Sequence, residues 1–259
     1  MRSIYKTWGV GLVSSLLLAA PSYAQLKSNA DADEDNYSSV TTMGVTTNTN
    51  SGLLGGFVFR QSKRLGGTFL GRPQFRYLAV EVVNVKHPKE VQQSLGFSGS
   101  RFVSGKENYL FVVRPQYGRE ISLFQRSADE GISINAIFAA GPSLGIVKPY
   151  YVEVNEGNNR KRTVAASTLI TRPGQPGSGA QPIGSGGFFR GFGESKLAVG
   201  ANIKAALNFE LSAFRNNTTG LEIGFLGELF PQKITIMSGA EARAFYSSGY
   251  ITLFFGTKK

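Results

Sequence analysis

The stretch LAVGANIKAALNFEL, residues 197–211, alternates between two kinds of side chain over its whole length. The odd positions are all apolar: Leu197, Val199, Ala201, Ile203, Ala205, Leu207, Phe209 and Leu211. The even positions are small, polar or charged: Ala198, Gly200, Asn202, Lys204, Ala206, Asn208 and Glu210. A period of two indicates a β-strand, because successive side chains of a strand point to opposite faces.

The length of this stretch and its two different faces predict a membrane-spanning strand. Strands of soluble proteins usually have about five or six residues, whereas a tilted strand that crosses a bilayer needs about 9–11. One face in lipid and the other in a polar lumen is typical of a transmembrane β-barrel. We therefore expect an all-β fold, an antiparallel up-and-down transmembrane barrel.

The start of the chain has the features of an export signal. Arg2 and Lys6 form a short positive region, an apolar core follows at 8–20, and Ser22-Tyr23-Ala24 fits the small-x-small pattern of a signal peptidase site. The apolar core is too short for a membrane anchor, so we expect a cleaved signal peptide over 1–24.

The rest of the chain then divides in two. Residues 25–37 are polar and acidic and are expected to be a disordered periplasmic lead, followed by a barrel domain over 38–259. The predicted location is the bacterial outer membrane. The chain has no cysteine, which excludes a lipoprotein anchor, disulfides and thiolate metal sites.

The chain is basic, with a formal net charge of +11 from 28 basic and 17 acidic residues. Loss of the expected signal peptide leaves 26 basic residues and a net charge of +9. In an exported protein the natural counter-charges are anionic lipid headgroups or wall polymers. We therefore expect membrane lipid and lipopolysaccharide as partners, and no nucleic acid.

Apolar–polar alternation and turn residues divide the barrel domain into strands. Eight are expected, spanning 39–46, 53–61, 75–86, 108–120 (with a continuation to 124), 132–154 (broken near Gly141-Pro142), 197–211, 221–230 and 245–256. An even number places both termini on one side, the periplasmic side in barrels of this class.

The predicted connections alternate in length. Short ones are expected at 62–73, 126–131 and 215–220, long ones at 87–107 and 155–196, and a medium one at 231–244. Short turns face the periplasm and long loops face outward in such barrels. The first outward connection, near Asn48, is short and departs from this rule, which makes the strand over 39–46 the weakest prediction.

If the apolar rows face lipid, the opposite parity places a set of charged side chains in the lumen. This predicted lumen network consists of Arg60, Glu81, Arg114, Lys204, Glu210, Glu222 and Glu228. Their signs are nearly balanced, as buried ion pairs require. The alternative fold, a soluble β-sandwich or lipocalin-like barrel, reverses the two faces; strand length, the signal peptide and the loop lengths favour the membrane barrel.

Eight strands leave a lumen just wide enough for side chains. The expected function is therefore that of a plugged barrel in a structural or interaction role. A narrow pore or small-solute transporter is the second hypothesis, which includes a proton or ion path through the lumen.

An outer-membrane lipid hydrolase or acyltransferase is the third hypothesis. The single histidine, His87, could in principle work with Ser94, Ser98 or Ser100 and with Glu90 or Glu81. None of these serines lies in a nucleophile motif. We therefore expect no enzyme activity, no catalytic residue, no cofactor and no metal, and a calcium site at Glu153 and Glu156 is disfavoured by the basic loop around it.

The long connection 155–196 carries most of the candidate binding residues. They are Arg160, Lys161, Arg162, Arg172, Phe188, Phe189 and Arg190. Two interpretations stay open: a mobile surface loop that folds over the barrel mouth, or a docking site for lipid A phosphates or a partner protein. The Gly-rich centre at 173–179 is flexible low-complexity sequence and contains no phosphate-loop motif.

Several short blocks carry a resemblance to a known group. They are VKHPKE at 85–90, GKENY at 105–109, RPQYGR at 114–119, GPSLG at 141–145 and KPY at 148–150. These blocks resemble a poorly characterised group of small outer-membrane barrels of the Bacteroidota, porin-family-like or PorT-like. The resemblance implies an outer-membrane barrel over about 40–257 that is an accessory subunit of a larger envelope complex for secretion or barrel assembly, and it transfers no catalytic residue.

Overall fold

A computed structural model of the chain describes residues 37–50, 52–94, 101–125, 132–155, 160–170, 180, 182–211 and 217–259. The predicted signal peptide over 1–24 and nearly all of the predicted lead over 25–37 lie outside these residues. No helix within the described residues is long and apolar enough to cross a bilayer.

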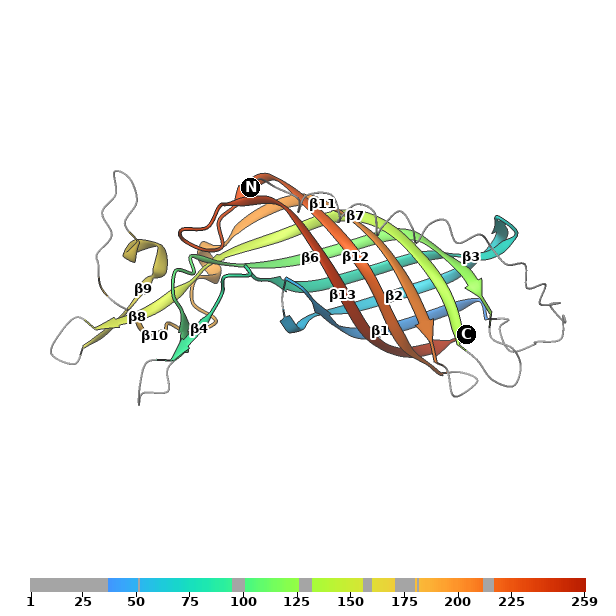
Figure 1. Cartoon of the computed structure of the whole chain (residues 1–259), viewed down its shortest axis with the longest axis horizontal. Coiled ribbons are helices and arrows are strands. Elements are labelled where there is room, and N and C mark those ends of the chain that lie inside the picture. Colours follow the sequence, from blue (N-terminus) through green and yellow to red (C-terminus); the bar gives the residue numbers. More distant parts are fainter. Residues whose placement is uncertain are drawn as a thin grey trace, which may run out of the picture. The chain divides into compact units, whose positions relative to one another are not determined.

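Eight long strands form a closed antiparallel barrel (Figure 1). In chain order they are β1 (Ser39–Asn48), β2 (Gly52–Phe69), β3 (Arg72–Val85), β6 (Asn108–Phe124), β7 (Ser133–Pro149), β11 (Lys196–Glu210), β12 (Asn217–Ile234) and β13 (Arg243–Lys258). Each strand pairs with its neighbour in sequence among these eight, and β1 pairs with β13 to close the ring. The prediction of an eight-stranded up-and-down barrel is confirmed, and its weakest element, the first strand, is present.

Two predicted connections are wrong because strands run beyond the apolar band. β2 and β3 extend through the predicted 62–73 turn and meet at a two-residue turn, Leu70-Gly71, where both φ angles are positive, at 50° and 75°. Such a pair matches the twist of a two-residue hairpin, although the left-handed conformation is unfavourable for leucine. β12 likewise continues through Pro231 to Ile234, which shortens the predicted 231–244 loop.

The predicted fifth strand, 132–154, is also corrected. β7 is not broken at Gly141-Pro142, but the chain leaves the barrel after Pro149. Pairing between β6 and β7 is instead interrupted between Val113↔Leu144 and Tyr117↔Ala140. Pro115 and Pro142 lie in this interval, and proline has no N–H to donate to a ladder.

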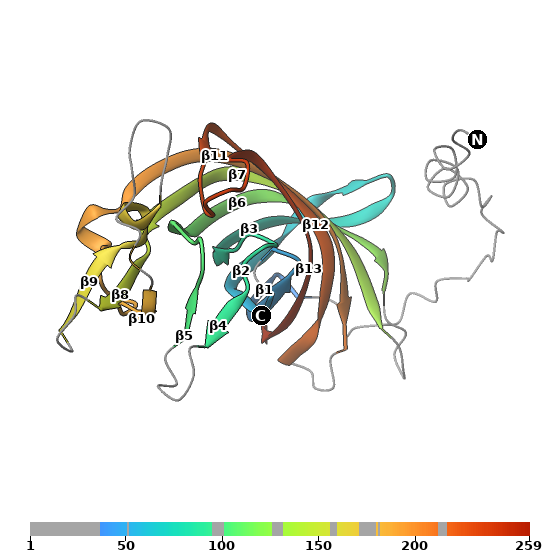
Figure 2. The ribbon, with the colours of Figure 1, turned by 60° about the vertical axis from the view of Figure 1, so that its left-hand side comes forward.

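The long connections form small sheets of their own at one end of the barrel. β8 (Tyr151–Asn155) pairs with β9 (Lys161–Ala165) and β10 (Pro182–Ser185), while β4 (Gln92–Ser94) pairs with β5 (Arg101–Val103). Two 3-10 helices, η4 (Ala166–Leu169) and η5 (Phe192–Glu194), complete the longest connection. Figure 2 shows both sheets beyond the same end of the barrel, which we call the long-loop end. The opposite end, with the β2–β3 turn and the C-terminus, is the short-turn end.

The two faces of the barrel wall have opposite polarity. On β11, Ile203 is 68% exposed, whereas its neighbour Lys204 is 4% exposed. The same alternation holds on β3, where Val80 and Val82 are exposed and Glu81 between them is buried. The apolar row of each strand therefore lies on the outside and the polar row lines the lumen.

The lumen also contains apolar layers. One cluster lies near the long-loop end and includes Leu110, Phe230, Ile236, Met237 and Tyr246. A second cluster, nearer the middle, includes Tyr77, Ile137 and Tyr250. Charged side chains contact these bulky residues; Lys204 Nζ, for example, lies 4.8 Å from the centre of the Tyr250 ring.

Candidate functional site

The seven predicted lumen residues are all buried inside the barrel. Each lies on the inward parity of its strand, as expected if the apolar rows face lipid. The structure divides them into three separate groups, two of which contain the predicted cations Arg60, Lys204 and Arg114.

The first group is centred on Glu222 of β12. Arg60 Nη1 on β2 lies 2.8 Å from Glu222 Oε2, and Lys204 Nζ on β11 lies 2.8 Å from Oε1. Tyr250 donates its hydroxyl to Oε1 at 2.6 Å, and Arg60 Nε donates to Thr42 Oγ1 at 2.9 Å. One carboxylate therefore links four strands across the lumen.

The second group is centred on Arg114 of β6. Its Nε and Nη2 atoms donate to the two oxygens of Glu228, each at 2.8 Å, and Nη1 lies 3.3 Å from Glu81 Oε2. Ser143 adds a hydrogen bond to Glu228 at 2.5 Å. A bidentate arginine–carboxylate pair is the strongest geometry for such a contact.

The third group combines the predicted Glu210 with residues that the sequence analysis did not single out. Lys258, near the C-terminus, forms an ion pair with Glu210. Glu120 accepts hydrogen bonds from Ser62 at 2.5 Å, from Asn135 at 2.9 Å and from Asn208 at 3.3 Å. Glu120 has the inward parity of Arg114, and this parity could have identified it.

At the long-loop end, Lys148 is a cation on the outward row of β7. It is fully buried, because residues 186–194 fold over it. Its ammonium donates to the backbone oxygens of Phe188 and Arg190, both at 2.8 Å. It also lies 4.8 Å from the centre of the Tyr109 ring and 5.1 Å from that of Phe192. Cation–π contacts of this kind stabilise a desolvated ammonium.

A second ammonium approaches the same ring. Lys106 Nζ lies 4.2 Å from the centre of Tyr109 and forms an ion pair with Glu90 at 2.5 Å. Burial lowers the pKa of Lys106, and the Glu90 carboxylate opposes this shift. We call Tyr109, Phe111, Phe188, Phe189 and Phe192 the aromatic rim; Phe189 is its most exposed member, at 83%.

The predicted loop residues fall at two places in the longest connection. Phe188, Phe189 and Arg190 lie between β10 and η5, on the aromatic rim. Arg160, Lys161 and Arg162 lie at the start of β9, on the other edge of the small sheet, where Lys161 lies 3.9 Å from Glu153. Arg172, like the flexible centre predicted at 173–179, lies outside the described residues.

His87 lies in a rim pocket of about 190 Å³ with Lys86, Arg243 and Ser247. Its Nδ1 accepts a hydrogen bond from the backbone N–H of Lys89 at 3.1 Å. Burial and the positive charges of Arg243 and Lys89 lower its pKa. Glu90 accepts from the backbone N–H of His87, not from its ring.

The other predicted partners of His87 are placed as follows. Ser94 is at the end of β4, and Ser98 and Ser100 lie outside the described residues. Among the described residues there is no group of three or more His, Cys, Asp or Glu side chains that could hold a metal ion.

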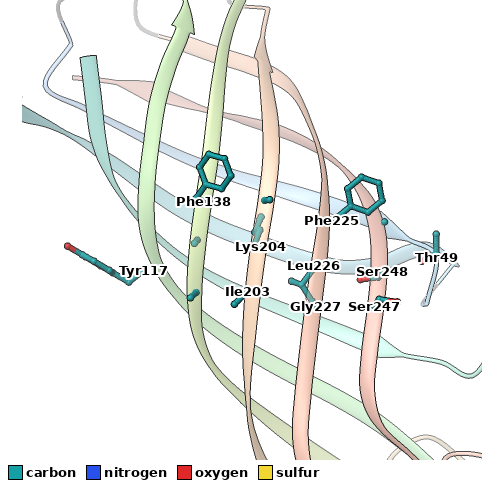
Figure 3. Close-up of a pocket in the computed structure, with 14 residues that line it drawn as sticks. Thr49, Tyr117, Phe138, Ile203, Lys204, Phe225, Leu226, Gly227, Ser247 and Ser248 are labelled. Carbon is teal, nitrogen blue, oxygen red and sulfur yellow. The ribbon is translucent and has the colours of Figure 1, made fainter. Parts of the chain in front are cut away.

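The outer wall carries a hollow of about 830 Å³ that crosses β7, β11, β12 and β13. Figure 3 shows Phe138, Ile203 and Phe225 around this hollow. Ala205, Gly227 and Gly249 lie between these larger side chains on the outward rows and leave the space open.

The barrel belongs to the class of eight-stranded barrels with a polar interior and an apolar outer wall. No protein-family model matches the chain. A comparison with curated proteins finds no match either.

Two bacterial proteins are among the solved structures to which this chain is similar. Ail, the attachment invasion locus protein of Yersinia pestis, in complex with the heparin analogue sucrose octasulfate, gives a TM-score of 0.38 at 8% identity, covering 85% of this chain and 97% of that chain. Neisserial surface protein A (NspA) gives a TM-score of 0.35 at 10% identity, covering 85% and 96%. These values describe structural likeness and assign no function.

Proposed function

We propose that this chain is an outer-membrane β-barrel with a closed polar lumen, which acts as a structural or interaction protein. The observation that carries the proposal is the polarity of the wall. Water-soluble barrels bury apolar rows and expose polar ones, whereas here the exposed rows are apolar and the charged rows are enclosed. Such a surface is stable only against hydrocarbon.

The orientation follows from the lengths of the connections. Barrels of this class have short periplasmic turns and longer external loops. The short-turn end, with the C-terminus, then faces the periplasm, and the small sheets face the exterior. The resemblance to the Bacteroidota barrels agrees with this assignment, and membership of that group remains part of the proposal.

The binding role rests on the chemistry of the long-loop end. Basic residues outnumber acidic ones there, and Arg160, Arg162 and Arg190 are distributed over the longest connection. The aromatic rim adds exposed apolar rings beside these charges. Aromatic and basic side chains together suit the interface between acyl chains and phosphates, so we propose lipopolysaccharide or an anionic envelope partner as the ligand.

The test is binding of lipopolysaccharide to the folded, detergent-solubilised chain, compared with the variant Arg160→Gln/Lys161→Gln/Arg162→Gln. A basic residue near an anionic surface contributes about 1 kcal/mol, so we expect the triple variant to bind about 10- to 100-fold more weakly. Lys259→Gln, at the short-turn end, is the control and should bind as the unmodified chain does. Equal affinity of all three proteins would contradict this role for the β9 residues.

A further inference from the structure

Three basic side chains lie in one row across the outer wall, near the short-turn end. Lys63 on β2 is paired with Arg76 on β3, and Arg76 is paired with Arg119 on β6. All three have the outward parity of their strands, since their neighbours Ser62, Tyr77 and Glu120 are buried in the lumen. We call these three residues the basic row.

The basic row has no counter-charge within the described residues. None of its members forms an ion pair or a side-chain hydrogen bond there, in contrast to Arg60, Arg114 and Lys204 of the lumen. The Nε atom of Arg76 is buried and has no hydrogen-bond partner. Like charges directly opposite each other across strands are destabilising, so this arrangement calls for an anion.

The basic row also marks one edge of the apolar band. On β3, the outward positions after Arg76 are Leu78, Val80 and Val82, and the next is Asn84. The eight-residue interval from Arg76 to Asn84 corresponds to roughly 27 Å along a strand. A tilt of about 35–45° reduces this to roughly 20 Å across the membrane, comparable with the apolar band of such barrels, about 25 Å tall. The basic row therefore lies at headgroup level.

An apolar groove begins at the next outward position of the same strands. It has a volume of about 470 Å³. Its outward lining residues include Phe59, Gln61, Leu78, Val80, Tyr117 and Pro142. It lies over the interval where β6 and β7 are not paired, next to the small residue Ala140. Gln61 and Tyr117 lie next to the basic row and bring polar groups to that end of the groove.

We propose that the basic row and this groove form a binding site for one anionic phospholipid of the periplasmic leaflet. The headgroup phosphate binds Lys63, Arg76 and Arg119, and an acyl chain lies in the groove. This inference rests on the membrane location proposed above, and it adds a ligand at the end opposite to the external loops.

The experiment titrates the folded full chain in neutral detergent with phosphatidylglycerol, and detects bound lipid by native mass spectrometry. The headgroup variant is Lys63→Gln/Arg76→Gln/Arg119→Gln. The groove variant is Ala140→Phe, which fills the groove and keeps all charges. The control, Lys89→Gln/Arg101→Gln/Lys233→Gln, removes the same charge from exposed positions at the long-loop end, outside the longest connection.

We expect the headgroup variant to bind phosphatidylglycerol at least tenfold more weakly than the unmodified chain does. The groove variant should also bind it more weakly, and the control should bind it with unchanged affinity. Inorganic phosphate at the same concentration should not displace the lipid; displacement would mean that the row is a simple phosphate site and would overturn the proposal. Equal binding by the headgroup variant and the unmodified chain would also overturn it, as would an equal loss in the control.

Thermal unfolding provides a second readout. Without lipid, the headgroup variant should unfold at a higher temperature than the unmodified chain, because like-charge repulsion is removed. Phosphatidylglycerol should raise the unfolding temperature of the unmodified chain only; an equal rise in both would contradict the site. Heat-shifted gel mobility on the same samples reports the folded barrel. If the headgroup variant folds in detergent and still binds the lipid, this site is refuted. The assignment of the chain as a membrane barrel is not affected by that result.

Discussion

Glu222 receives side-chain contacts from three other strands, through Arg60, Lys204 and Tyr250. Removal of one partner from a buried charged group costs about 3–5 kcal/mol, because the remaining charges are left uncompensated. The carboxylate is therefore a structural centre of the lumen. An ordinary surface ion pair contributes much less, about 0–1 kcal/mol.

We expect Glu222→Gln to lower the free energy of unfolding by about 3–5 kcal/mol, measured by urea unfolding in detergent micelles or lipid vesicles. The matched control is Glu153→Gln, which removes a partly exposed carboxylate near Lys161 and should change the free energy of unfolding by less than about 1 kcal/mol. Similar urea midpoints for the two variants would show that the lumen network does not stabilise the barrel.

Ile203 tests the opposite face of the same strand. It projects from the outer wall beside the buried Lys204, and a lysine on the lipid face costs about 2–4 kcal/mol near the middle of the membrane. Ile203→Lys should therefore fold poorly into lipid vesicles, as seen by loss of heat-shifted gel mobility, while Ile203→Val should fold normally. Efficient folding of Ile203→Lys would mean that the apolar row does not face lipid.

At the scale of elements, the approach of β7 to β6 depends on Gly141. A Cβ atom at this position would lie 1.9 Å from the backbone oxygen of Pro115, which cannot move without displacing the strand. At Gly227 of β12 the closest atoms would be side-chain carbons of Ile203 and Phe245, both at 3.6 Å, which are ordinary contacts.

Gly141→Ala should therefore lower the thermal unfolding temperature of the detergent-solubilised barrel clearly, whereas Gly227→Ala should leave it nearly unchanged. Differential scanning fluorimetry on the two variants provides the comparison. An unchanged unfolding temperature for Gly141→Ala would show that β6 and β7 can separate at the interrupted ladder without loss of stability.

The sequence was sufficient to predict the strands that carry alternating side chains. Parity separated Lys204 from Ile203, and strand length, the signal peptide and the loop lengths indicated that the row of Lys204 faces the lumen. The same signal disappears beyond the apolar band, where β2 continues through the polar residues Ser62, Lys63 and Arg64. This is why the predicted 62–73 turn was wrong.

The long-loop end could be predicted only in part. Basic and aromatic residues in 155–196 were visible, but the pairing of β8 with β9 and β10 depends on contacts between segments without clear alternation. Lys148 could have indicated part of this arrangement. A lysine on the outward row of β7, in line with Leu144 and Ile146, is expected to be shielded from lipid by another segment of the chain. The cover, Phe188 and Phe192, lies about forty residues later and could not be derived from local pattern.

At the scale of the whole molecule, the barrel is a filled cylinder with two chemically different ends. Bulky side chains such as Tyr77, Phe230 and Tyr250 occupy the lumen together with the ion pairs. The long-loop end carries basic residues and the aromatic rim, and the basic row lies toward the short-turn end. This arrangement supports the proposed role in binding lipid or protein at the membrane surface.

The central claim, that the outer wall faces hydrocarbon and the lumen does not, can be tested with two neighbouring residues. Phe254 is 3% exposed and points inward, while Phe255 is 55% exposed and points outward. Trp8 is the only tryptophan of the chain, so replacing it with Phe leaves a background free of tryptophan. Single Phe254→Trp and Phe255→Trp variants are then folded into bilayers that contain brominated phospholipids.

Quenching of tryptophan fluorescence by bromine requires contact with the acyl chains. We expect strong quenching of the tryptophan at position 255 and little quenching of the one at position 254. Equal quenching at the two positions, or stronger quenching at 254, would contradict the claim that the outer wall faces hydrocarbon and the lumen does not.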